Sequence, residues 1–382
     1  MEIFMAILAA VAGAAFIVIA LWEGFETIIL PRRVTRRFRF TRVFYRTTWR
    51  PWMKLGRAVI PVNRRETWLG CFGPLSLLLL LSVWAFILII GFALLHWAAG
   101  SAVFANDGHG GFFIDLYLSG TTFFTLGLGD VLPHNSVGRV LVVLESGLGF
   151  AFLALVIGYL PALNQSFARR EVSISLLDAR AGSPPCASEM LRRHSHHGGM
   201  ESLQKLLGEW ERWSAEFLEG HLSYPVLAYF RSQHDNQSWL GALTAILDTC
   251  ALIMAGVEGT CARQAELTFA MSRHAVVDLS LVFYTKPRQP KADRLPKETL
   301  EELRALLARS GQKLGNGDEF ERKLKELREM YEPYVSALAA HFHIGLPPWV
   351  ARGDSADNWL GSYWERPAKK HDQLPNRGGE HF

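Results

Sequence analysis

The chain has 382 residues, enough for two or three modules of ordinary size. Hydrophobic residues make up 49% and charged residues 20% of it, a mixture that excludes disorder and predicts one part in a membrane and one part in water. The formal net charge of +4 is unevenly distributed, because eleven Arg and one Lys face a single acid between Pro31 and Glu66. A basic block between two apolar stretches predicts a cytoplasmic loop rather than a nucleic-acid surface, so we expect no nucleic-acid partner. The four cysteines lack paired metal-ligand spacing, and we expect them to be reduced.

The first apolar stretch runs without a charge from Ile3 to Trp22, about the length of helix that crosses the hydrocarbon core of a bilayer. A cleaved signal peptide is the alternative, but Glu2 stands where a signal peptide carries positive charge, and the apolar run is too long. We therefore assign residues 1–30 to an N-terminal transmembrane helix and residues 31–70 to a basic cytoplasmic loop. The positive-inside rule then places the N-terminus outside the cell.

Two further apolar stretches follow the basic block. Phe72 to Leu95 is uncharged and is predicted to run from inside to outside. Val140 to Leu163 carries one acid, Glu145, and is predicted to return to the cytoplasm, because two arginines follow it. Three spans make the chain a multi-pass protein of the cell (inner) membrane, embedded in the lipid bilayer, with a cytoplasmic C-terminal domain.

A fourth span is conceivable from Trp239 to Val257. Asp248 stands near its middle, and a carboxylate at the centre of a bilayer costs about 3 kcal/mol. We therefore favour a buried core helix of a water-exposed domain, in which Asp248 is buried and hydrogen-bonded.

Between the second and third spans, Phe112 to Phe124 is too short to cross a membrane but suits a re-entrant half-helix. The sequence TLGLGD follows at once. It resembles the potassium-channel filter signature T-x-G-[YF]-G-D and stands, as in that family, between an outer and an inner helix. The resemblance covers about Leu75 to Leu163. It implies an all-α membrane protein with a potassium-channel-like pore at 71–165, comprising an outer helix 72–97, pore helix 112–124, filter 125–130 and inner helix 137–163.

Physical chemistry supports a filter at this place. Irregular backbone at membrane depth is tolerated where it is buried in protein or lines a water-filled path. Glycines at alternate positions allow the positive φ values that turn successive carbonyls toward one axis. Potassium would then be bound by carbonyl oxygens and one hydroxyl, with an acid at the outer mouth that concentrates cations or braces the filter. These residues are Thr125, Leu126, Gly127 and Leu128 for the ion, followed by Gly129 and Asp130.

One filter per chain implies a homotetramer, because four filter strands close one pore. The family usually has Tyr where this chain has Leu128, so the hydroxyl that would tie the filter to the pore helix is absent. Weaker discrimination between potassium and sodium therefore stays open. The alternative is that this glycine-rich stretch is only an external turn between two spans, which leaves the preceding half-helix unexplained.

The inner helix carries one stripe of residues at helical spacing. If this stripe faces the pore, its acid would attract cations. If it faces the pore helix, its acid would brace the filter through Thr121 or Thr122. We favour the second arrangement, because four carboxylates around one cavity would repel each other. The stripe consists of Glu145, Gly149, Phe152 and Val156. Phe152 and Tyr159 are candidates for a hydrophobic constriction. Gly147 or Gly149 resembles the glycine hinge of channel inner helices, and simple helix packing is an equal alternative.

The remainder of the chain is predicted to be a linker, a helical cytoplasmic domain and an irregular tail. Their ranges are 166–199, 200–345 and 346–382. The linker contains HSHH, a weak candidate for a metal site. The predicted helices are Met200–Leu218, Tyr224–Gln233, Ser238–Gly256, Cys261–Tyr284, Lys297–Ala308 and Asp318–Phe342, the last kinked or split by Pro333.

A polar cluster in a connection between helices could bind an unknown cytoplasmic ligand or cap the following helix; it comprises Arg231, His234, Asp235 and Asn236. No catalytic motif or cofactor signature appears in the sequence, so we expect no enzyme and no cofactor besides the permeant ion. The sequence thus predicts a tetrameric potassium-selective channel, gated by an unknown signal at the helical domain. A weakly selective monovalent-cation channel and a non-conducting membrane-anchored scaffold are the alternatives.

Overall fold

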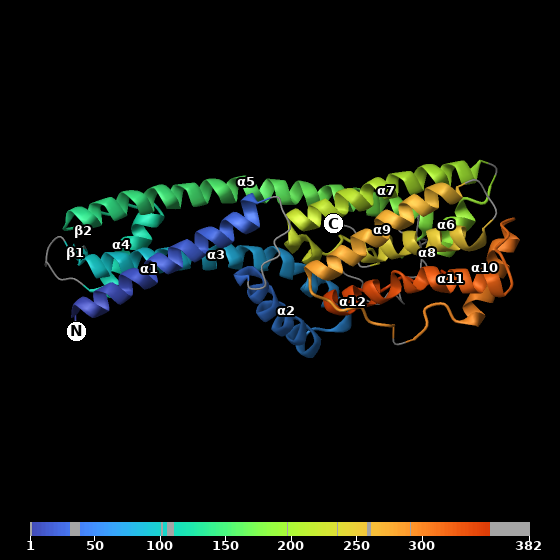
Figure 1. The fold of residues 1–382 in the computed structure, drawn as a ribbon, viewed down its shortest axis with the longest axis horizontal. Helices are drawn as coiled ribbons and strands as arrows, with labels where there is room; N and C mark the ends of the chain where they lie inside the picture. The colour runs from blue at the N-terminus through green and yellow to red at the C-terminus, as the bar shows by residue number, and fades with distance from the viewer. Residues whose placement is uncertain are drawn as a thin grey trace, which may run out of the picture. The chain divides into compact units, whose positions relative to one another are not determined.

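A computed structural model describes residues 2–30, 39–100, 102–104, 111–196, 198–234, 236–257, 261–290 and 292–351. The chain divides into two compact units, Met1–Gln165 and Ser166–Phe382 (Figure 1). Apart from two short strands, the regular elements of the described residues are helices, which confirms the all-α class.

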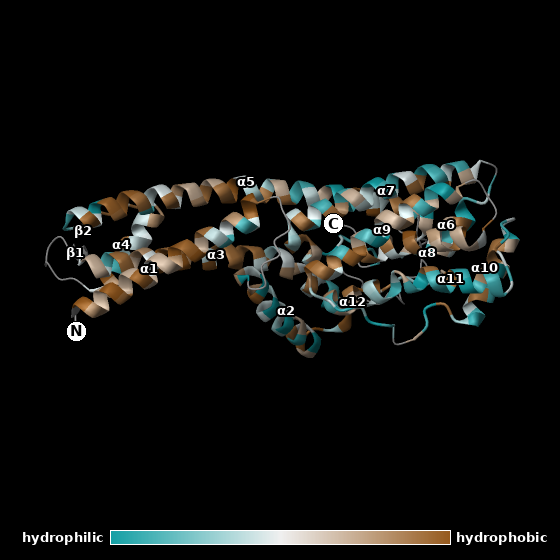
Figure 2. Ribbon diagram, viewed as in Figure 1, coloured by the Kyte–Doolittle hydropathy of each residue, from teal (hydrophilic) through white to brown (hydrophobic). Residues whose placement is uncertain are grey.

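The first unit is built from long apolar helices. Its elements are α1 (Glu2–Gly24), η1 (Phe25–Ile29), α2 (Phe40–Val59), η2 (Val62–Arg64), α3 (Arg65–Ala99), β1 (Ala102–Phe104), α4 (Phe112–Phe123), β2 (Val131–Pro133) and the first part of α5 (Ser136–Ala181). Helices α1, α3 and α5 are long and apolar enough to cross a membrane, as predicted for the three spans. Figure 2 shows α1, α3 and the first part of α5 as mainly hydrophobic, whereas α2 is largely hydrophilic.

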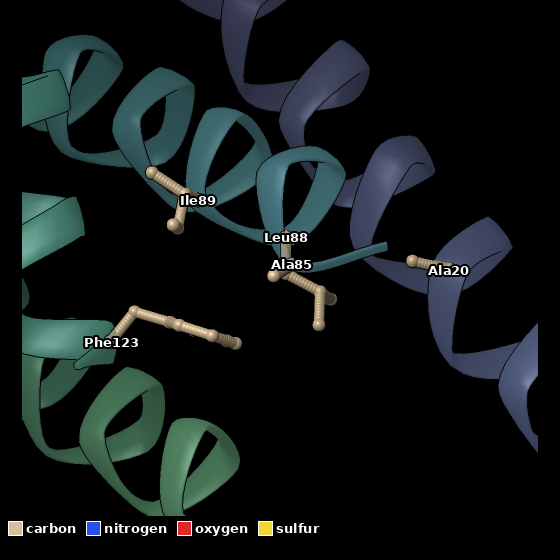
Figure 3. Close-up of a cluster of buried hydrophobic side chains, with 5 residues drawn as sticks. All are labelled: Ala20, Ala85, Leu88, Ile89 and Phe123. Atoms are coloured by element: carbon tan, nitrogen blue, oxygen red, sulfur yellow. The ribbon is translucent and has the colours of Figure 1, made fainter. Parts of the chain in front are cut away.

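The two membrane helices α1 and α3 cross closely at a pair of glycines. A Cβ added to Gly13 would lie 2.5 Å from the Gly91 carbonyl oxygen, so no side chain fits at this crossing. Small residues at such points let helix backbones approach within a membrane, where packing rather than the hydrophobic effect drives association. Farther along, Ala20 of α1 and Leu88 of α3 belong to a buried cluster that includes Phe123 at the end of α4 (Figure 3).

The predicted basic loop at 31–70 is wrong in part, because a helix of 20 residues, α2, occupies residues 40–59. The helix is amphipathic, with Phe44 and Trp49 buried and its basic residues on another side. Trp49 packs edge-on against Phe72 of α3, with 4.8 Å between the ring centroids. The outer helix begins at Arg65 rather than at 72, because α3 continues back through polar residues toward α2.

The predicted linker at 166–199 is also wrong. Helix α5 runs on from the inner helix to Ala181, and α6 (Ala187–Arg193) follows after a short turn. Ile174 and Leu177 of α5 are buried, as is Met190 of α6, so this stretch contributes to the core of the second unit. Its local composition resembles a linker, but its apolar residues recur at helical spacing and are buried.

The second unit continues with α7 (Gly199–Ser223), η3 (Pro225–Tyr229), α8 (Trp239–Gly256), α9 (Ala262–Val282), α10 (Lys297–Arg309), α11 (Asp318–Glu329) and α12 (Glu332–Phe342). The break between α11 and α12 stands just before Pro333, as predicted. The helix expected at Tyr224–Gln233 is wrong, because only a short 3-10 turn forms there. The predicted irregular tail at 346–382 is described only as far as residue 351. Within this part Trp349 is buried, and its backbone carbonyl accepts a hydrogen bond from the Ser188 amide (3.2 Å), so the start of the tail packs on the second unit.

Helix α8, the conceivable fourth span, is the core helix of the second unit. It is long and apolar enough to cross a membrane, but 83% of its apolar window is buried by the rest of the protein. Asp248 on this helix is fully buried, and Arg294 donates two hydrogen bonds to its carboxylate (3.1 and 2.7 Å). The Tyr331 hydroxyl donates a third at 2.5 Å. The expectation of a buried, hydrogen-bonded Asp248 is therefore confirmed.

Candidate functional site

The site begins where α4 ends. The backbone after Phe123 stays attached to the last turn of that helix, because the Thr125 amide donates to the Thr122 carbonyl (2.9 Å) and the Leu126 amide to the Thr121 carbonyl (2.7 Å). Helix α4 therefore presents its C-terminal, negative end to the segment that follows. This end favours a cation beside it.

The segment from Thr125 to Gly129 has an unusual backbone. Thr125, Gly127 and Gly129 have positive φ values of 55°, 57° and 78°, whereas Leu126 and Leu128 between them do not. This alternation of sign turns successive peptide planes alternately, which brings successive carbonyl oxygens to one side of the chain. A row of carbonyl oxygens can replace the water around a dehydrated cation.

Beyond the segment, the chain is fixed by a small sheet and by a side chain of α4. Strands β1 and β2 pair antiparallel, with Phe104 opposite Val131. Asp130, just before β2, accepts a hydrogen bond from the Tyr117 hydroxyl of α4 (2.9 Å). The segment is thus held at its start by the end of α4 and at its exit by Tyr117.

Three buried polar side chains meet behind the segment, one from each of three helices. Glu145 of α5 contacts the Ser119 hydroxyl of α4, which also donates to the Ile89 carbonyl (2.8 Å). The His96 ring of α3 lies 3.4 Å from the other Glu145 oxygen. All three side chains are fully buried, so Glu145 points into the helix packing of its own chain and not toward an open cavity.

This geometry corrects the expected partners of Glu145. The Thr121 hydroxyl donates to backbone carbonyls of its own helix, at Tyr117 and Leu118 (both 3.0 Å), and the carboxylate meets Ser119 instead. Ser119 stands two residues before Thr121, so it lies on another face of α4. The sequence could indicate that Glu145 faces the pore helix, but not which residue of that helix it meets.

Two further residues of the inner-helix stripe, Gly149 and Phe152, also face α4. A Cβ on Gly149 would lie 2.0 Å from the Phe123 carbonyl oxygen, so helix packing explains this glycine. Phe152 packs against Phe123 with 5.8 Å between ring centroids, which places it in the core beside α4 rather than in a constriction. Tyr159 is buried as well. Gly147 lies on the exposed side of α5, where a Cβ would meet no atom of the described residues within 4 Å, and its role as a hinge stays a prediction.

The apolar side chains around the segment are not covered by their own chain. Leu126 and Leu128 are 60% and 63% exposed, and Phe124 and Phe150 are similarly open. Exposed irregular backbone with apolar side chains is stable at membrane depth only when protein covers it. The arrangement therefore indicates an oligomer in which further copies surround the segment.

In the polar cluster of the second unit, the hydrogen bonds of Arg231 to two backbone carbonyls are those of a helix cap, and a ligand site there stays a prediction. Arg231 donates to the carbonyls of Phe342 (2.6 Å) and His343 (3.1 Å), so it caps the C-terminal end of α12. Ser238 caps α8 by accepting from the Gly241 amide (2.9 Å). His234 and Asn236 lie in the turn between them, and Asp235 lies outside the described residues. No group of three potential metal-ligating side chains occurs in the described part of the chain, HSHH included as far as it is described.

Sequence reasoning missed three residues of the site: Tyr117, Ser119 and His96. A hydroxyl on a pore helix or a histidine at the end of an apolar run carries no local signal for its partner. Each partner stands between 13 and 49 residues away in the chain, and only the packing of α3, α4 and α5 brings them together.

Comparison with known protein families gives one match, to a family model described as "Ion channel", over residues 79–165. Comparisons with curated proteins and with solved structures found no match. The matched range begins within α3 and ends within α5, so it contains α4, the segment from Thr125 to Asp130 and the Glu145 contacts. Residues 79–165 of the chain therefore match the ion-channel family, and the helices α3 and α5 in which this range begins and ends are long and apolar enough to cross a membrane.

Proposed function

We propose that the protein is a homotetrameric potassium-selective channel whose filter is Thr125 to Asp130. The observation that supports this most directly is the alternation of φ at Thr125, Gly127 and Gly129, because it directs the carbonyl oxygens of one strand to one side. Four such strands would surround a dehydrated potassium ion with oxygen ligands. A single chain supplies one strand and leaves it exposed, which fits assembly from four copies.

Conduction through such a filter is passive. The ion sheds water as it enters and binds the carbonyl oxygens of Thr125, Leu126, Gly127 and Leu128, with the hydroxyl of Thr125 at the inner end. The C-terminal end of α4 lowers the energy of the cation on the inner side. Asp130 at the outer mouth attracts cations while its hydrogen bond to Tyr117 holds the exit of the filter.

Selectivity for potassium over sodium depends on how firmly the filter keeps its width. Leu128 lacks the hydroxyl usual at this place in the family, which favours the second candidate, a weakly selective monovalent-cation channel. The Tyr117 hydroxyl supplies a tie between the filter and α4 in another way. The buried contact between Glu145 and Ser119 adds support behind α4, so we favour selectivity.

We further propose that the second unit controls gating and that α5 transmits the signal. This helix belongs to both units, since it runs unbroken from Ser136 to Ala181. Within the second unit, Arg170 of α5 is buried and donates to the carbonyls of Leu227 (2.8 Å) and Phe230 (2.9 Å). A change in the η3 segment would therefore act on the end of α5.

The proposal is tested by reversal potentials of the purified protein in planar bilayers with potassium on one side and sodium on the other. We expect a reversal potential near that of potassium. In Leu128→Tyr the added phenol should keep conduction and raise potassium over sodium selectivity, because it adds a tie to the filter. A reversal potential near zero in the wild type would support the weakly selective channel, and the absence of current would support the scaffold.

Tyr117→Phe removes one hydrogen bond and little else. Such a bond is worth about 1 kcal/mol, so we expect the potassium over sodium permeability ratio to fall several-fold while tetramers still form. Tyr284→Phe in the second unit is the matched control and should leave the ratio unchanged. A ratio unchanged in Tyr117→Phe would show that the Asp130 contact does not hold the filter.

A further inference from the structure

Helix α2 carries a row of positive side chains on one side. Arg46, Arg50 and Lys54 follow one another at intervals of four residues, so they are neighbours along the helix surface. All three are exposed, α2 contains no acid, and no ion pair reaches them from the described residues of the chain. Like charges at this spacing destabilise a helix. An anionic partner on this side would remove that repulsion.

Another side of α2 is fixed to the beginning of α3. The Trp52 and Trp68 rings stack with centroids 4.2 Å apart and planes at 11°. Each indole N–H donates to the backbone carbonyl of the other residue, both at 3.2 Å. A Cβ added to Gly56 would lie 2.5 Å from the Trp68 ring, so α2 and α3 touch without a gap. The basic row is therefore carried by a rigid helix.

Both ends of α2 are tied to membrane helices. The buried Glu23 carboxylate near the end of α1 accepts from the amides of Phe40 (3.0 Å) and Thr41 (3.3 Å), the first free N–H groups of α2. At the other end, Arg65 of α3 donates to the carbonyls of Arg57 and Ile60 (both 3.2 Å). Helix α2 thus starts where one apolar helix ends and finishes where the next begins, which is the level of the lipid headgroups.

We propose that Arg46, Arg50 and Lys54 bind the phosphate groups of anionic phospholipids at this surface. Two features favour lipid over a nucleic acid or an acidic protein. The helix is anchored between two spans, and the apolar side chains of Val59 and Val62, 66% and 75% exposed, follow the row on the way to α3. Clustered Lys and Arg next to a membrane helix attract anionic lipid, and a rigid row loses little freedom on binding.

The test is lipid binding by the purified full chain in detergent, measured by native mass spectrometry with phosphatidylglycerol and, in parallel, phosphatidylcholine. The wild type should bind phosphatidylglycerol more tightly than phosphatidylcholine. Each basic side chain near an anionic surface contributes about fivefold, so R46Q/R50Q/K54Q should raise the Kd for phosphatidylglycerol about 100-fold and leave that for phosphatidylcholine unchanged. R46K/R50K keeps the charges and should bind like the wild type.

The matched control removes the same charge elsewhere. R212Q/R263Q/R322Q changes three exposed arginines of α7, α9 and α11, and it should keep the wild-type Kd. Equal affinity of the wild type for both lipids, or an unchanged Kd in R46Q/R50Q/K54Q, would overturn the proposal. So would release of the lipid by an equimolar amount of inorganic phosphate or by an oligonucleotide, because the row would then bind any anion. The readout is independent of ion flux, so its failure leaves the channel proposal standing.

Discussion

Gly127→Ala is expected to abolish potassium flux while the protein still assembles. Gly127 has a φ of 57°, and a side chain in this left-handed region costs about 1 to 2 kcal/mol. A tetrameric filter would carry this cost four times, about 4 to 8 kcal/mol in all, which is enough to change the filter's conformation. We therefore expect flux from protein-containing liposomes to fall more than 100-fold, as measured by potassium-dependent uptake of a tracer ion.

The loss of flux expected in Gly127→Ala has a cause other than a steric clash of the added methyl group. A Cβ on Gly127 would meet no atom within 4 Å among the residues that the structure describes, so strain of the backbone rather than a clash within the chain is the expected reason. Gly120→Ala is the matched control, because Gly120 also has free space but lies inside α4 with an ordinary φ. It should conduct. Wild-type flux through assembled Gly127→Ala protein would mean that ions do not use this path, and the channel proposal would have to be withdrawn.

Asp248→Ala is expected to destabilise the second unit by about 3 to 5 kcal/mol. The substitution leaves the largely buried Arg294 guanidinium with Glu332 as its acidic partner and takes from the buried Tyr331 hydroxyl its acceptor, and removing one side of a buried ion-pair network costs this much. Cys250 on the same helix offers a readout, since burial raises the pKa of its thiol and hides it from reagents. We expect its labelling by a maleimide to accelerate by two orders of magnitude or more.

An exposed pair provides the comparison. Glu216→Ala also removes a carboxylate from an arginine, Arg212, but both side chains are more than half exposed, so the change should cost less than about 1 kcal/mol. Its Cys250 labelling should match the wild type. Equal labelling rates in Asp248→Ala and Glu216→Ala would show that the buried network does not stabilise α8.

The sequence predicts best where one local signal dominates. Long uncharged runs identify α1, α3 and the first part of α5, and the two glycines of TLGLGD predict the positive φ values found at Gly127 and Gly129. Pro333 likewise locates the break between α11 and α12. These features depend on hydrophobicity and on backbone sterics, which a few adjacent residues determine.

The failures occur where tertiary packing decides. The charge of the basic stretch before α3 predicts a loop, yet residues 40–59 form the helix α2, which packs on α3 through the contact between Trp52 and Trp68. The stretch after Gln165 reads as a linker by composition, yet α5 continues through it because Ile174 and Leu177 are buried by the second unit. The local sequence pattern of these two stretches does not show which distant residues they pack against. The same holds for Glu145, whose position on a helix face is predictable and whose contact with Ser119 is not.

The close contact at Gly149 holds α5 against the end of α4. The Gly149 backbone touches the Phe123 carbonyl with no room for a methyl group, so we expect α5 to keep its position against the end of α4 at this point. If the C-terminal end of α5 moves, we therefore expect the helix to bend at a point after Gly149 in the chain. Pro161 provides the place, since it cannot donate to the Ile157 carbonyl, and Gly158 nearby has free space. We expect the part of α5 around Gly149 to stay rigid and a bend to fall near Pro161.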